Sequence, residues 1–351
     1  MKRIFSKISL IATIALFTLA SCGDDDAVTP QTAPIYDMSG FVKGADVSWL
    51  TEMEAKGTKF YDADGREQEC LSLLRSLGVN AVRLRVWVNP ANGWNAKQDV
   101  LTKAWRAKQL GFRIMIDFHY SDTWADPGQQ IVPEAWKNYS SDEMRQAVAD
   151  HTVEVLTALK AKGIDVEWVQ VGNETPDGML YDAGRASKSM SSYAKLELSG
   201  YNAVKSVYPE AKVIVHLDKG DNLRRFTWLF DGLKANGGKW DVIGMSLYPE
   251  DSNWQELTAN CLSNVKTLQA RYDTEVMICE VGMSWDSANA EAFMTQIVNG
   301  CRAIDKCLGV FYWEPECYNG WNGYTKGAFD NRGRPTNALS IFKPETATAD
   351  I

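Results

Sequence analysis

The chain has 351 residues, of which 23% are charged, and its formal net charge is −8 at pH 7. This length suits one large domain, such as a closed barrel of alternating strands and helices, which takes about 250 residues. The acidic balance argues against nucleic acid or an anionic membrane surface as a partner, because both repel a negatively charged protein, and it fits a neutral ligand.

The N-terminus is predicted to be an export signal rather than part of the fold. Basic residues precede the apolar run Ile8–Leu19, which is too short to span a bilayer and is typical of a secretory signal. The tetrapeptide Leu-Ala-Ser-Cys that ends at Cys22 resembles a bacterial lipobox, in which the signal is removed and the cysteine is lipidated. We therefore expect residues 1–21 to be a lipoprotein signal peptide and Cys22 to carry the lipid. A non-lipidated signal with a chance cysteine is the alternative.

Residues 22–36 are predicted to be a tether between this anchor and the folded domain. The acidic tract Asp24–Asp26 resembles the surface-export signal of Bacteroidetes lipoproteins, and a solvated charge run is the alternative. Ala27–Ile35 is rich in Thr and Pro, as extended linkers are. The sequence thus predicts an outer-membrane lipoprotein that is attached through its lipid anchor and exposed at the cell surface.

Residues 37–351 are predicted to form one (β/α)8 barrel of the TIM-barrel type, and we expect a monomer. Eight short apolar runs alternate with longer amphipathic segments, at the spacing that parallel βαβ units need. A doubly wound open sheet is the alternative fold, but no G-x-G-x-x-G follows the first run, which disfavours dinucleotide binding. The predicted strands are Val42–Val47, Ala81–Val88, Arg113–His119, Val166–Gly172, Lys212–Leu217, Val242–Leu247, Glu275–Cys279 and Gly309–Trp313.

The clearest predicted helix runs from Ser140 to Gly163. Ser140 and Glu143 form the sequence of a capping box, apolar residues follow at helical spacing, and Gly163 is typical of a left-handed cap. His151 falls on the apolar stripe of this helix. We expect it to be structural, because the outer helices of such a barrel lie far from the strand ends.

Two glutamates are candidates for catalysis because each ends an apolar run. Glu174 follows the fourth predicted strand and Glu280 follows the seventh. Side chains at the carboxyl ends of barrel strands converge on one site. Two carboxylates there can divide the cleavage of a glycosidic bond, one protonated as general acid and the other ionised as nucleophile. Taken alone, either glutamate could instead cap a helix or pair with an arginine.

Other strand ends supply polar and aromatic groups that would surround the two glutamates. Arg83 or Arg85 could hold the nucleophile ionised through a bidentate hydrogen bond, or could serve other buried acids. Asn173 could bond a sugar hydroxyl, or could be a turn residue. Tryptophans follow several strand ends, where an indole ring suits the face of a pyranose as well as a packed core. They are Trp49, Trp87, Trp124 and Trp313.

Neither the histidines nor the cysteines predict a metal or a cofactor. His119 and His216 lie at strand ends, but without a third histidine there they fit sugar hydroxyls better than a metal ion. No cysteine pair has the C-x-x-C spacing of a zinc site. Cys279 is expected to be a free buried thiol, and one disulfide is allowed among three cysteines that lie close in sequence. These are Cys301, Cys307 and Cys317.

Five stretches of the sequence closely resemble glycoside hydrolase family 53, the endo-β-1,4-galactanases. They are Gly44–Ser48, Asn80–Pro90, Ile116–Gly128, Gly172–Glu174 and Phe311–Pro315. The third stretch is long and specific, and the resemblance extends from about Val42 to Phe342. It implies a retaining (β/α)8 enzyme whose acid/base ends strand four and whose nucleophile ends strand seven.

The resemblance also implies a role for each matching residue, and it implies no cofactor. Glu174 would be the acid/base, Glu280 the nucleophile, and Asn173 the contact to the sugar 2-hydroxyl. Arg83 would lie near the nucleophile. The remaining residues that would contact the substrate are Asp46, His119, Trp124, Asp126, His216, Asp218, Tyr248 and Trp313.

Two departures from the family pattern affect the details. Glu250 follows Tyr248 and Pro249 where the family has a phenylalanine, which makes that subsite less certain. The segment Met283–Asn289 is short and lacks the Asp, His and Asn spacing of calcium-binding members. We therefore expect no metal at that place, and a more open cleft.

The sequence thus predicts a retaining endo-β-1,4-galactanase. It would hydrolyse β-1,4-galactan, including the type I arabinogalactan side chains of pectin, to galacto-oligosaccharides. One alternative is a mannanase-like β-glycanase of the same clan, which the long third-strand motif disfavours. The other is a non-catalytic, surface glycan-binding lipoprotein, which the presence of both glutamates disfavours.

Overall fold

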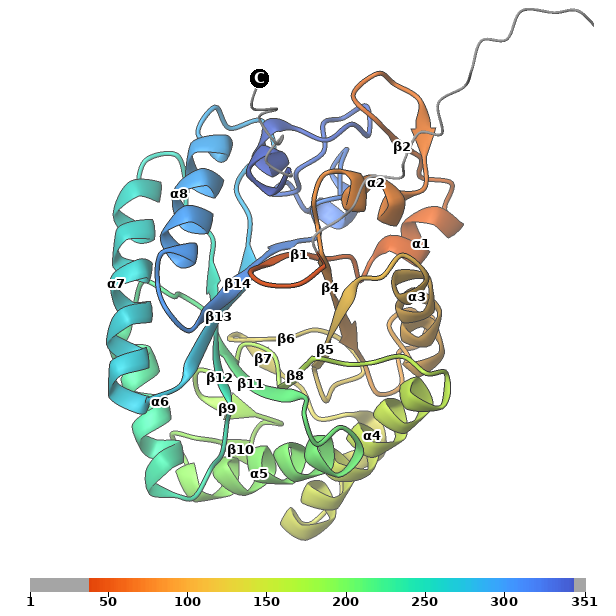
Figure 1. The fold of residues 1–351 in the computed structure, drawn as a ribbon. Coiled ribbons are helices and arrows are strands. Elements are labelled where there is room, and N and C mark those ends of the chain that lie inside the picture. The colour runs from red at the N-terminus through yellow and green to blue at the C-terminus, as the bar shows by residue number, and fades with distance from the viewer. Residues whose placement is uncertain (1–37, 344–351) are drawn as a thin grey trace, which may run out of the picture. The chain divides into compact units, whose positions relative to one another are not determined.

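The barrel lies in the part of the chain that the computed structural model describes, residues 38–343. Eight parallel strands close in the order β1-β14-β13-β12-β11-β8-β5-β4 (Figure 1). They are β1 (Val42–Asp46), β4 (Ala81–Val86), β5 (Arg113–Phe118), β8 (Trp168–Val171), β11 (Lys212–Leu217), β12 (Val242–Leu247), β13 (Glu275–Val281) and β14 (Cys307–Trp313). The predicted (β/α)8 barrel is confirmed, with strand ends that differ by at most two residues from those expected.

The predicted signal peptide, the lipidation site Cys22 and the tether over residues 22–36 all lie outside the described residues. Within residues 38–343, no helix combines the length and the apolar character that crossing a membrane requires.

Eight α-helices of the described chain surround the barrel (Figure 1). They are α1 (Leu50–Ala55), α2 (Cys70–Ser76), α3 (Lys97–Gln109), α4 (Ser141–Ala161), α5 (Met190–Val207), α6 (Leu223–Ala235), α7 (Trp254–Tyr272) and α8 (Ala290–Arg302). Short 3-10 turns add η1 (Glu134–Trp136), η2 (Trp321–Gly323) and η3 (Asn337–Phe342).

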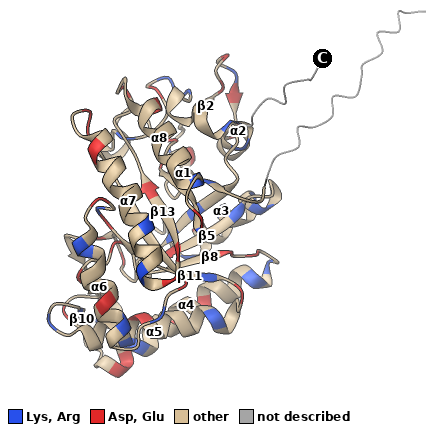
Figure 2. Cartoon of the chain, turned by 60° about the vertical axis from the view of Figure 1, so that its left-hand side comes forward, with Lys and Arg blue, Asp and Glu red and all other residues tan. Residues whose placement is uncertain are grey.

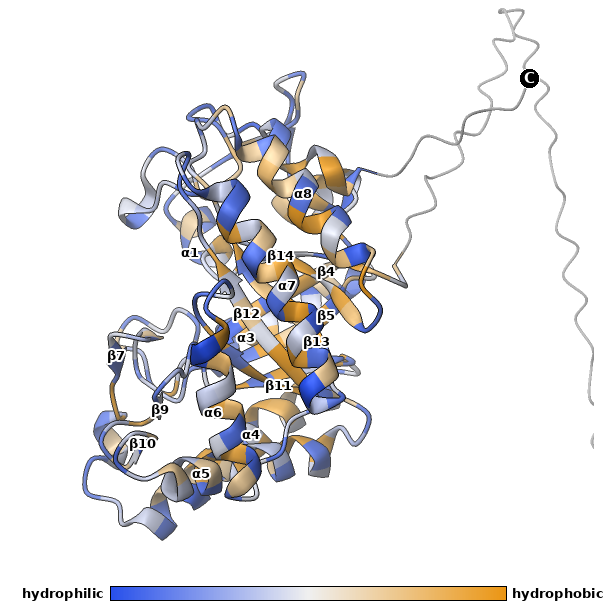
Figure 3. Cartoon of the chain, turned by 90° about the vertical axis from the view of Figure 1, so that its left-hand side faces the viewer, coloured by the Kyte–Doolittle hydropathy of each residue, from blue (hydrophilic) through white to orange (hydrophobic). Residues whose placement is uncertain are grey.

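Two apolar layers stabilise the barrel. One lies between the strands and the helices, where the apolar faces of the helices turn inward (Figure 3). The other fills the barrel interior, with Trp168 and Phe311 among its largest members. Gly44 in β1 makes room for that interior layer, because a Cβ there would lie 2.2 Å from Cδ1 of Phe311. Lys, Arg, Asp and Glu residues are spread along the helices that surround the barrel (Figure 2).

Helix α4 begins and ends as its sequence predicts. The Oγ of Ser140 accepts a hydrogen bond from the backbone N–H of Glu143, and the Glu143 carboxylate accepts from the backbone N–H of Ser140. Gly163 follows the helix with φ of +63°. His151 is buried in the packed layer, with its ring edge-on to Phe118 at 5.6 Å. Its structural role is confirmed by that position.

The cysteines of the described chain are all free and buried. The disulfide allowed among Cys301, Cys307 and Cys317 is therefore absent. Cys317 lies apart from the other two, with its Sγ 3.8 Å from the sulfur of Met53. Cys279 is a buried thiol inside β13, as expected.

Three short hairpins in the loops after helices or strands were not expected from the sequence. They pair β2 (Phe60–Tyr61) with β3 (Glu67–Gln68), β6 (Ala125–Asp126) with β7 (Gln129–Gln130), and β9 (Gly178–Met179) with β10 (Gly184–Arg185). Strands of two residues are too short to show an alternating pattern. The second and third hairpins follow β5 and β8, so they lie at the carboxyl end of the barrel.

Candidate active site

A cleft of about 510 Å³ opens at the carboxyl ends of the barrel strands. It contains both predicted glutamates and five tryptophan and tyrosine side chains from the strand ends and loops. Its lining residues are Trp49, His119, Trp124, Ala125, Asp126, Asn173, Glu174, Tyr248, Glu280, Trp313, Asn322, Gly323, Tyr324 and Lys326.

The carboxyl end of β12 and the residue just after it supply one hydrogen-bond donor to each glutamate. The Ser246 hydroxyl donates to Oε1 of Glu174 at 2.7 Å, and the Tyr248 hydroxyl donates to Oε2 of Glu280 at 2.7 Å. Residues two apart on a strand share a face, so both donors reach the cleft. The pairing of β12 with β13 shifts between Met245 and Ser246, and such bulges redirect side chains near active sites.

The two carboxyl groups differ in their charged neighbours. Nη2 of Arg83 lies 2.8 Å from Oε1 of Glu280, whereas Glu174 has the Ser246 hydroxyl as its hydrogen-bond partner. Burial raises the pKa of Glu280 to about 7, and the charge of Arg83 and the bond from Tyr248 oppose the rise. Burial and the nearby charge of Glu280 raise the pKa of Glu174 well above its ordinary value. The shared proton therefore belongs on Glu174, with the negative charge on Glu280.

Arg83 is the centre of a fully buried polar network. Its Nη1 donates to Asp46 at 2.6 Å and its Nε donates to Gln170 at 2.6 Å, while Nη2 also lies 3.0 Å from Asp117. Burial alone would lower the pKa of Arg83, but the surrounding carboxylates raise it well above its ordinary value. The guanidinium thus remains charged and fixes the position of Glu280 from below the cleft.

The two histidines are neutral hydrogen-bonding groups. Nδ1 of His119 accepts from the indole N–H of Trp87 at 3.2 Å and from the backbone N–H of Ala125 at 3.1 Å. Its Nε2 must then carry the proton, which points to Asp117 at 3.0 Å. Burial lowers the pKa of His216 well below its ordinary value, and the charge of Arg83 lowers it further.

A hydrogen-bonded chain leads through His216 to the candidate acid. Nδ1 of His216 lies 2.9 Å from Nε2 of Gln170, a donor, and 3.0 Å from Oδ1 of Asn173, an acceptor. Its Nε2 lies 2.8 Å from Oγ of Ser246, whose own proton goes to Glu174. The imidazole therefore helps to hold Ser246 in place beside Glu174.

Aromatic rings form one wall and part of the floor of the cleft. Trp49 packs edge-on against Trp313 at 5.2 Å and against Trp124 at 5.4 Å, and Trp313 packs against Tyr324 at 4.7 Å. Next to these rings, the guanidinium of Arg85 lies over the ring of Trp124 at 4.3 Å. The same guanidinium forms a buried ion pair with Glu314, which follows β14. Fixed, amphipathic rings of this kind suit the apolar face of a sugar.

Six of the ten predicted substrate contacts line the cleft: His119, Trp124, Asp126, Asn173, Tyr248 and Trp313. The structure places the other four elsewhere. Asp46 and Arg83 belong to the buried network below the cleft, and His216 reaches the cleft through Ser246 and Asn173. Asp218 forms a two-pronged pair with Arg225 of α6, at 2.6 and 2.7 Å. Direct substrate contact by all ten stays a prediction.

Several lining residues were not found from the sequence. Asn322, Gly323, Tyr324 and Lys326 come from the loop after β14, which has no strand or helix pattern that would point to a site. Nζ of Lys326 lies 2.7 Å from Oε1 of Glu250, the residue that departs from the family pattern. An ion pair therefore joins the loops after β12 and β14 at the rim of the cleft.

Acidic side chains in and next to the loop after β13 hydrogen-bond to neighbouring Ser and Asn side chains. Asp251 accepts from Ser287 Oγ and from Asn289 Nδ2, and Asp286 accepts from Ser284 Oγ at 2.7 Å. Calcium takes six to eight oxygen ligands. Residues 38–343 include no group of three or more His, Cys, Asp or Glu side chains placed to hold a metal ion. The expected absence of calcium at this loop stays a prediction.

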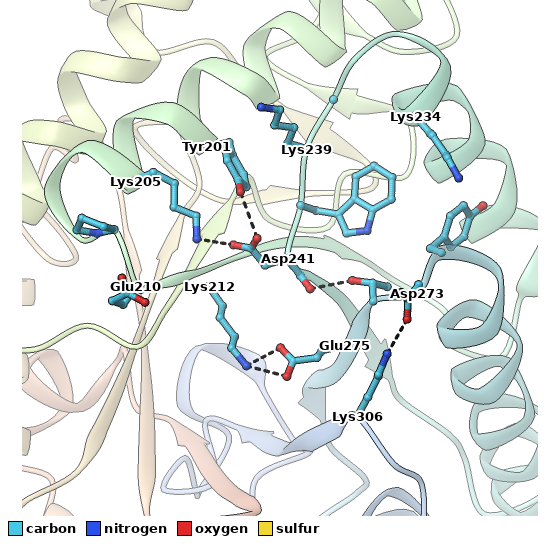
Figure 4. A pocket seen from close by; sticks show the side chains of 15 residues that line it. Tyr201, Lys205, Glu210, Lys212, Lys234, Lys239, Asp241, Asp273, Glu275 and Lys306 are labelled. Carbon is cyan, nitrogen blue, oxygen red and sulfur yellow. Dashed lines mark hydrogen bonds and ion pairs between the residues drawn. The ribbon is translucent and has the colours of Figure 1, made fainter.

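A second, larger hollow of about 700 Å³ lies at the opposite end of the barrel, beside the amino ends of β11, β12 and β13 (Figure 4). Six of its charged side chains form three ion pairs, each of which is at least partly exposed to solvent. Lys205 lies 2.8 Å from Asp241, and Lys212 lies 2.6 Å from Glu275. In barrels of this fold, function gathers at the carboxyl end of the strands. We therefore assign the active site to the smaller cleft.

Comparisons with known proteins agree with this assignment. The family model described as Glycosyl hydrolase family 53 matches residues 42–342. A Bacillus subtilis protein named endo-beta-1,4-galactanase is 30% identical over 307 residues, which cover 78% of this chain and 70% of that protein. A Neosartorya fischeri protein named probable arabinogalactan endo-beta-1,4-galactanase A is 30% identical over 299 residues, covering 78% of this chain and 83% of that protein.

Two solved structures are similar over most of the chain. A fungal beta-1,4-galactanase structure superposes with a TM-score of 0.81 and 27% identity, covering 88% of this chain and all of that one. A family 53 catalytic domain from Ignisphaera aggregans superposes with a TM-score of 0.79 and 30% identity, covering 87% of this chain and 96% of that one. The chain therefore belongs to glycosyl hydrolase family 53.

Proposed function

We propose that this protein is a retaining endo-β-1,4-galactanase that hydrolyses β-1,4-galactan, including the arabinogalactan side chains of pectin, to galacto-oligosaccharides. The observation that carries the proposal is the unlike surroundings of Glu174 and Glu280 in one cleft. Each carboxyl accepts from a hydroxyl, but Glu280 also lies 2.8 Å from the guanidinium of Arg83. The galactanase names of the Bacillus subtilis and Neosartorya fischeri relatives support the substrate.

In the first step, an oxygen of Glu280 attacks the anomeric carbon of the sugar. The bond from that carbon to the leaving oxygen breaks, and the proton of Glu174 passes to the leaving oxygen, which departs as a hydroxyl of the shortened chain. Glu280 is then esterified to the sugar, and Glu174 is ionised.

In the second step, Glu174 acts as a base. It takes a proton from a water molecule whose oxygen attacks the anomeric carbon, and the bond to Glu280 breaks. The carboxylate of Glu280 is restored, and the water oxygen takes the position that the leaving oxygen held. Arg83 and Tyr248 support both steps by holding the Glu280 carboxylate in one orientation.

The cleft suits a neutral polysaccharide rather than a charged one. Aromatic rings and uncharged hydrogen-bonding groups, among them His119 and Asn173, supply much of the lining around the two glutamates. Sugar rings stack on such aromatic faces, and their hydroxyls take the remaining hydrogen bonds.

The product profile on linear galactan, measured beside mannan and xylan, tests the proposal. We expect galacto-oligosaccharides from galactan and much slower release from the other two polymers. Preferential cleavage of mannan would favour a mannanase-like enzyme of the same clan. Binding of galactan without cleavage would favour a glycan-binding lipoprotein.

We also propose that the protein is a monomer anchored in the outer membrane through Cys22 and exposed at the cell surface. The lipobox-like sequence and the acidic tract after it support this location. Replacing Cys22 with Ser should release the protein from the membrane fraction without changing its activity on soluble galactan. A variant that stays membrane-bound would contradict lipidation. Protease treatment of intact cells should remove an outward-facing protein and spare a periplasmic one.

A further inference from the structure

The backbone that carries Glu174 is held in an unfavourable conformation. Glu174 has φ of +41°, in the left-handed region, two residues after Gly172 with φ of +85°. This conformation is sterically unfavourable for a residue with a Cβ. It persists only where surrounding groups fix it. Other groups must therefore hold the backbone of Glu174, the residue that would donate the proton.

Gln130 of the β6–β7 hairpin holds this backbone through hydrogen bonds. Its side chain is buried, and its Nε2 donates to the backbone carbonyl of Asn173 at 2.9 Å and to that of Glu174 at 3.1 Å. A third acceptor, the carbonyl of Asp126, lies at 3.2 Å within the same hairpin. One amide group thus holds two successive peptide carbonyls on either side of the Glu174 Cα.

The hairpin itself is held by hydrogen bonds to three other segments of the chain. The carbonyl of Ala125 accepts from Nδ2 of Asn173 at 2.8 Å, and the backbone N–H of Ala125 donates to His119. The carbonyl of Gln130 accepts from the backbone N–H of Tyr181 at 2.8 Å. Because the hairpin is tied at these points, its amide can resist rotation of the Asn173–Glu174 peptide.

We propose that Gln130 is a positioning residue for the general acid: it fixes the backbone of Glu174 so that the carboxyl proton points at the leaving oxygen. This inference rests on the proposed role of Glu174 as the acid. Glu280 is held separately, through Arg83 and Tyr248. Loss of the Gln130 amide should therefore impair proton donation more than nucleophilic attack.

The test compares two substrates in the full-length protein. One is linear galactan, whose sugar leaving group needs a proton, and the other is 2,4-dinitrophenyl β-1,4-galactobioside, whose aryl leaving group needs almost none. The variants are Gln130→Met, which removes the donor and keeps the length, and Gln130→Glu, which keeps the shape. Gln146→Met on the exposed face of α4 is the matched control.

We expect each Gln130 variant to lose about 10- to 100-fold in kcat/KM on galactan, the scale of a misplacement of about 1 Å. On the aryl substrate the loss in kcat/KM should stay below about threefold, because that constant reports the step before Glu174 acts as base.

Equal losses on both substrates would overturn the proposal, since they would indicate general damage to the cleft. Unchanged activity on galactan would overturn it as well. If Gln130→Met does not fold, Gln130→Glu decides the question alone. A wild-type protein that cleaves another β-glycan instead of galactan would contradict the proposed function, and the same ratio measured on that glycan would still test Gln130.

Discussion

The two ends of the barrel carry similar residue types in different surroundings. Strand β13 joins them, with Glu275 at its amino end in the hollow and Glu280 near its carboxyl end in the cleft. Glu275 pairs with Lys212, and both side chains are partly exposed. Glu280 is buried, and it shares the single cation Arg83 with Asp46 and Asp117.

This difference shows that the volume of a hollow does not predict whether its residues are catalytic. In the hollow, water and an ion-pair partner stabilise charges such as those of Lys212 and Glu275, and exposed pairs of this kind contribute about 0–1 kcal/mol. In the cleft, burial and an excess of carboxylates over cations raise the pKa of Glu174 and Glu280. Groups with such shifts can exchange protons with a substrate.

The largest expected effect separates the two ends of β13. Glu280→Gln should lower turnover of galactan more than about a hundredfold, the least expected from loss of one catalytic group, while oligosaccharide binding is largely kept. Glu275→Gln, at the other end of the strand, should leave turnover within about twofold, because it removes only an exposed ion pair. Steady-state kinetics and calorimetric binding measure both. Comparable losses in the two variants would mean that the cleft has no special role.

The second prediction concerns the acid. Glu174→Ala should slow galactan hydrolysis far more than hydrolysis of an aryl galactoside, because an activated aryl group departs without protonation. Azide should restore part of the aryl activity, since a small anion fits the vacated space. If both substrates lose activity to the same degree, Glu174 is not the general acid.

A buried carboxylate behind the hollow tests whether a shifted pKa alone implies catalysis. Glu197 of α5 is fully buried, accepts from the backbone N–H of Lys239, and has its pKa raised by burial from 4.5 to about 8. Between these pH values only the unfolded chain ionises this group, so the folded state loses stability as the pH rises through that window.

Glu197→Gln should remove this loss. We expect little change in the free energy of unfolding at pH 4.5, a gain of roughly 1–4 kcal/mol at pH 8.5, and unchanged kcat on galactan. Urea unfolding at the two pH values measures the gain. A gain of the same size at both pH values would show that the raised pKa is not its cause.

The smallest effect is expected at the rim of the hollow. Lys306→Met removes the exposed pair with Asp273, whose atoms lie 2.6 Å apart. The free energy of unfolding should fall by less than about 1 kcal/mol, and less still at high salt, with no change in activity. A loss of several kcal/mol would show that the hollow is more than a solvated surface.

The sequence predicted the barrel and the catalytic pair because both depend on local pattern. Apolar runs of strand length mark the eight barrel strands, and Glu174 and Glu280 are carboxylates at the ends of such runs. The same reasoning could not distinguish residues that line the cleft from residues that only support it. Asp218 also ends a strand, yet Arg225 lies within its reach on the next helix and pairs with it.

Gln130 and Tyr324 were not predicted, because their roles do not depend on a local sequence pattern. Each stands in a loop without a periodic pattern, and its contribution depends on contacts with distant parts of the chain, such as the Asn173 carbonyl or the Trp313 ring. Contacts of this kind follow from the closed barrel, not from the neighbouring residues in sequence.

The most direct test of the account is the configuration of the first sugar product. If Glu280 attacks the anomeric carbon and Glu174 serves as acid and then as base, the two carboxyl groups act about 5–5.5 Å apart, too close to admit a water molecule between them. Proton NMR within the first minutes of galactan digestion should then show the β-anomer at the new reducing end, before mutarotation. An initial α-anomer would contradict the retaining mechanism and the roles given to both glutamates.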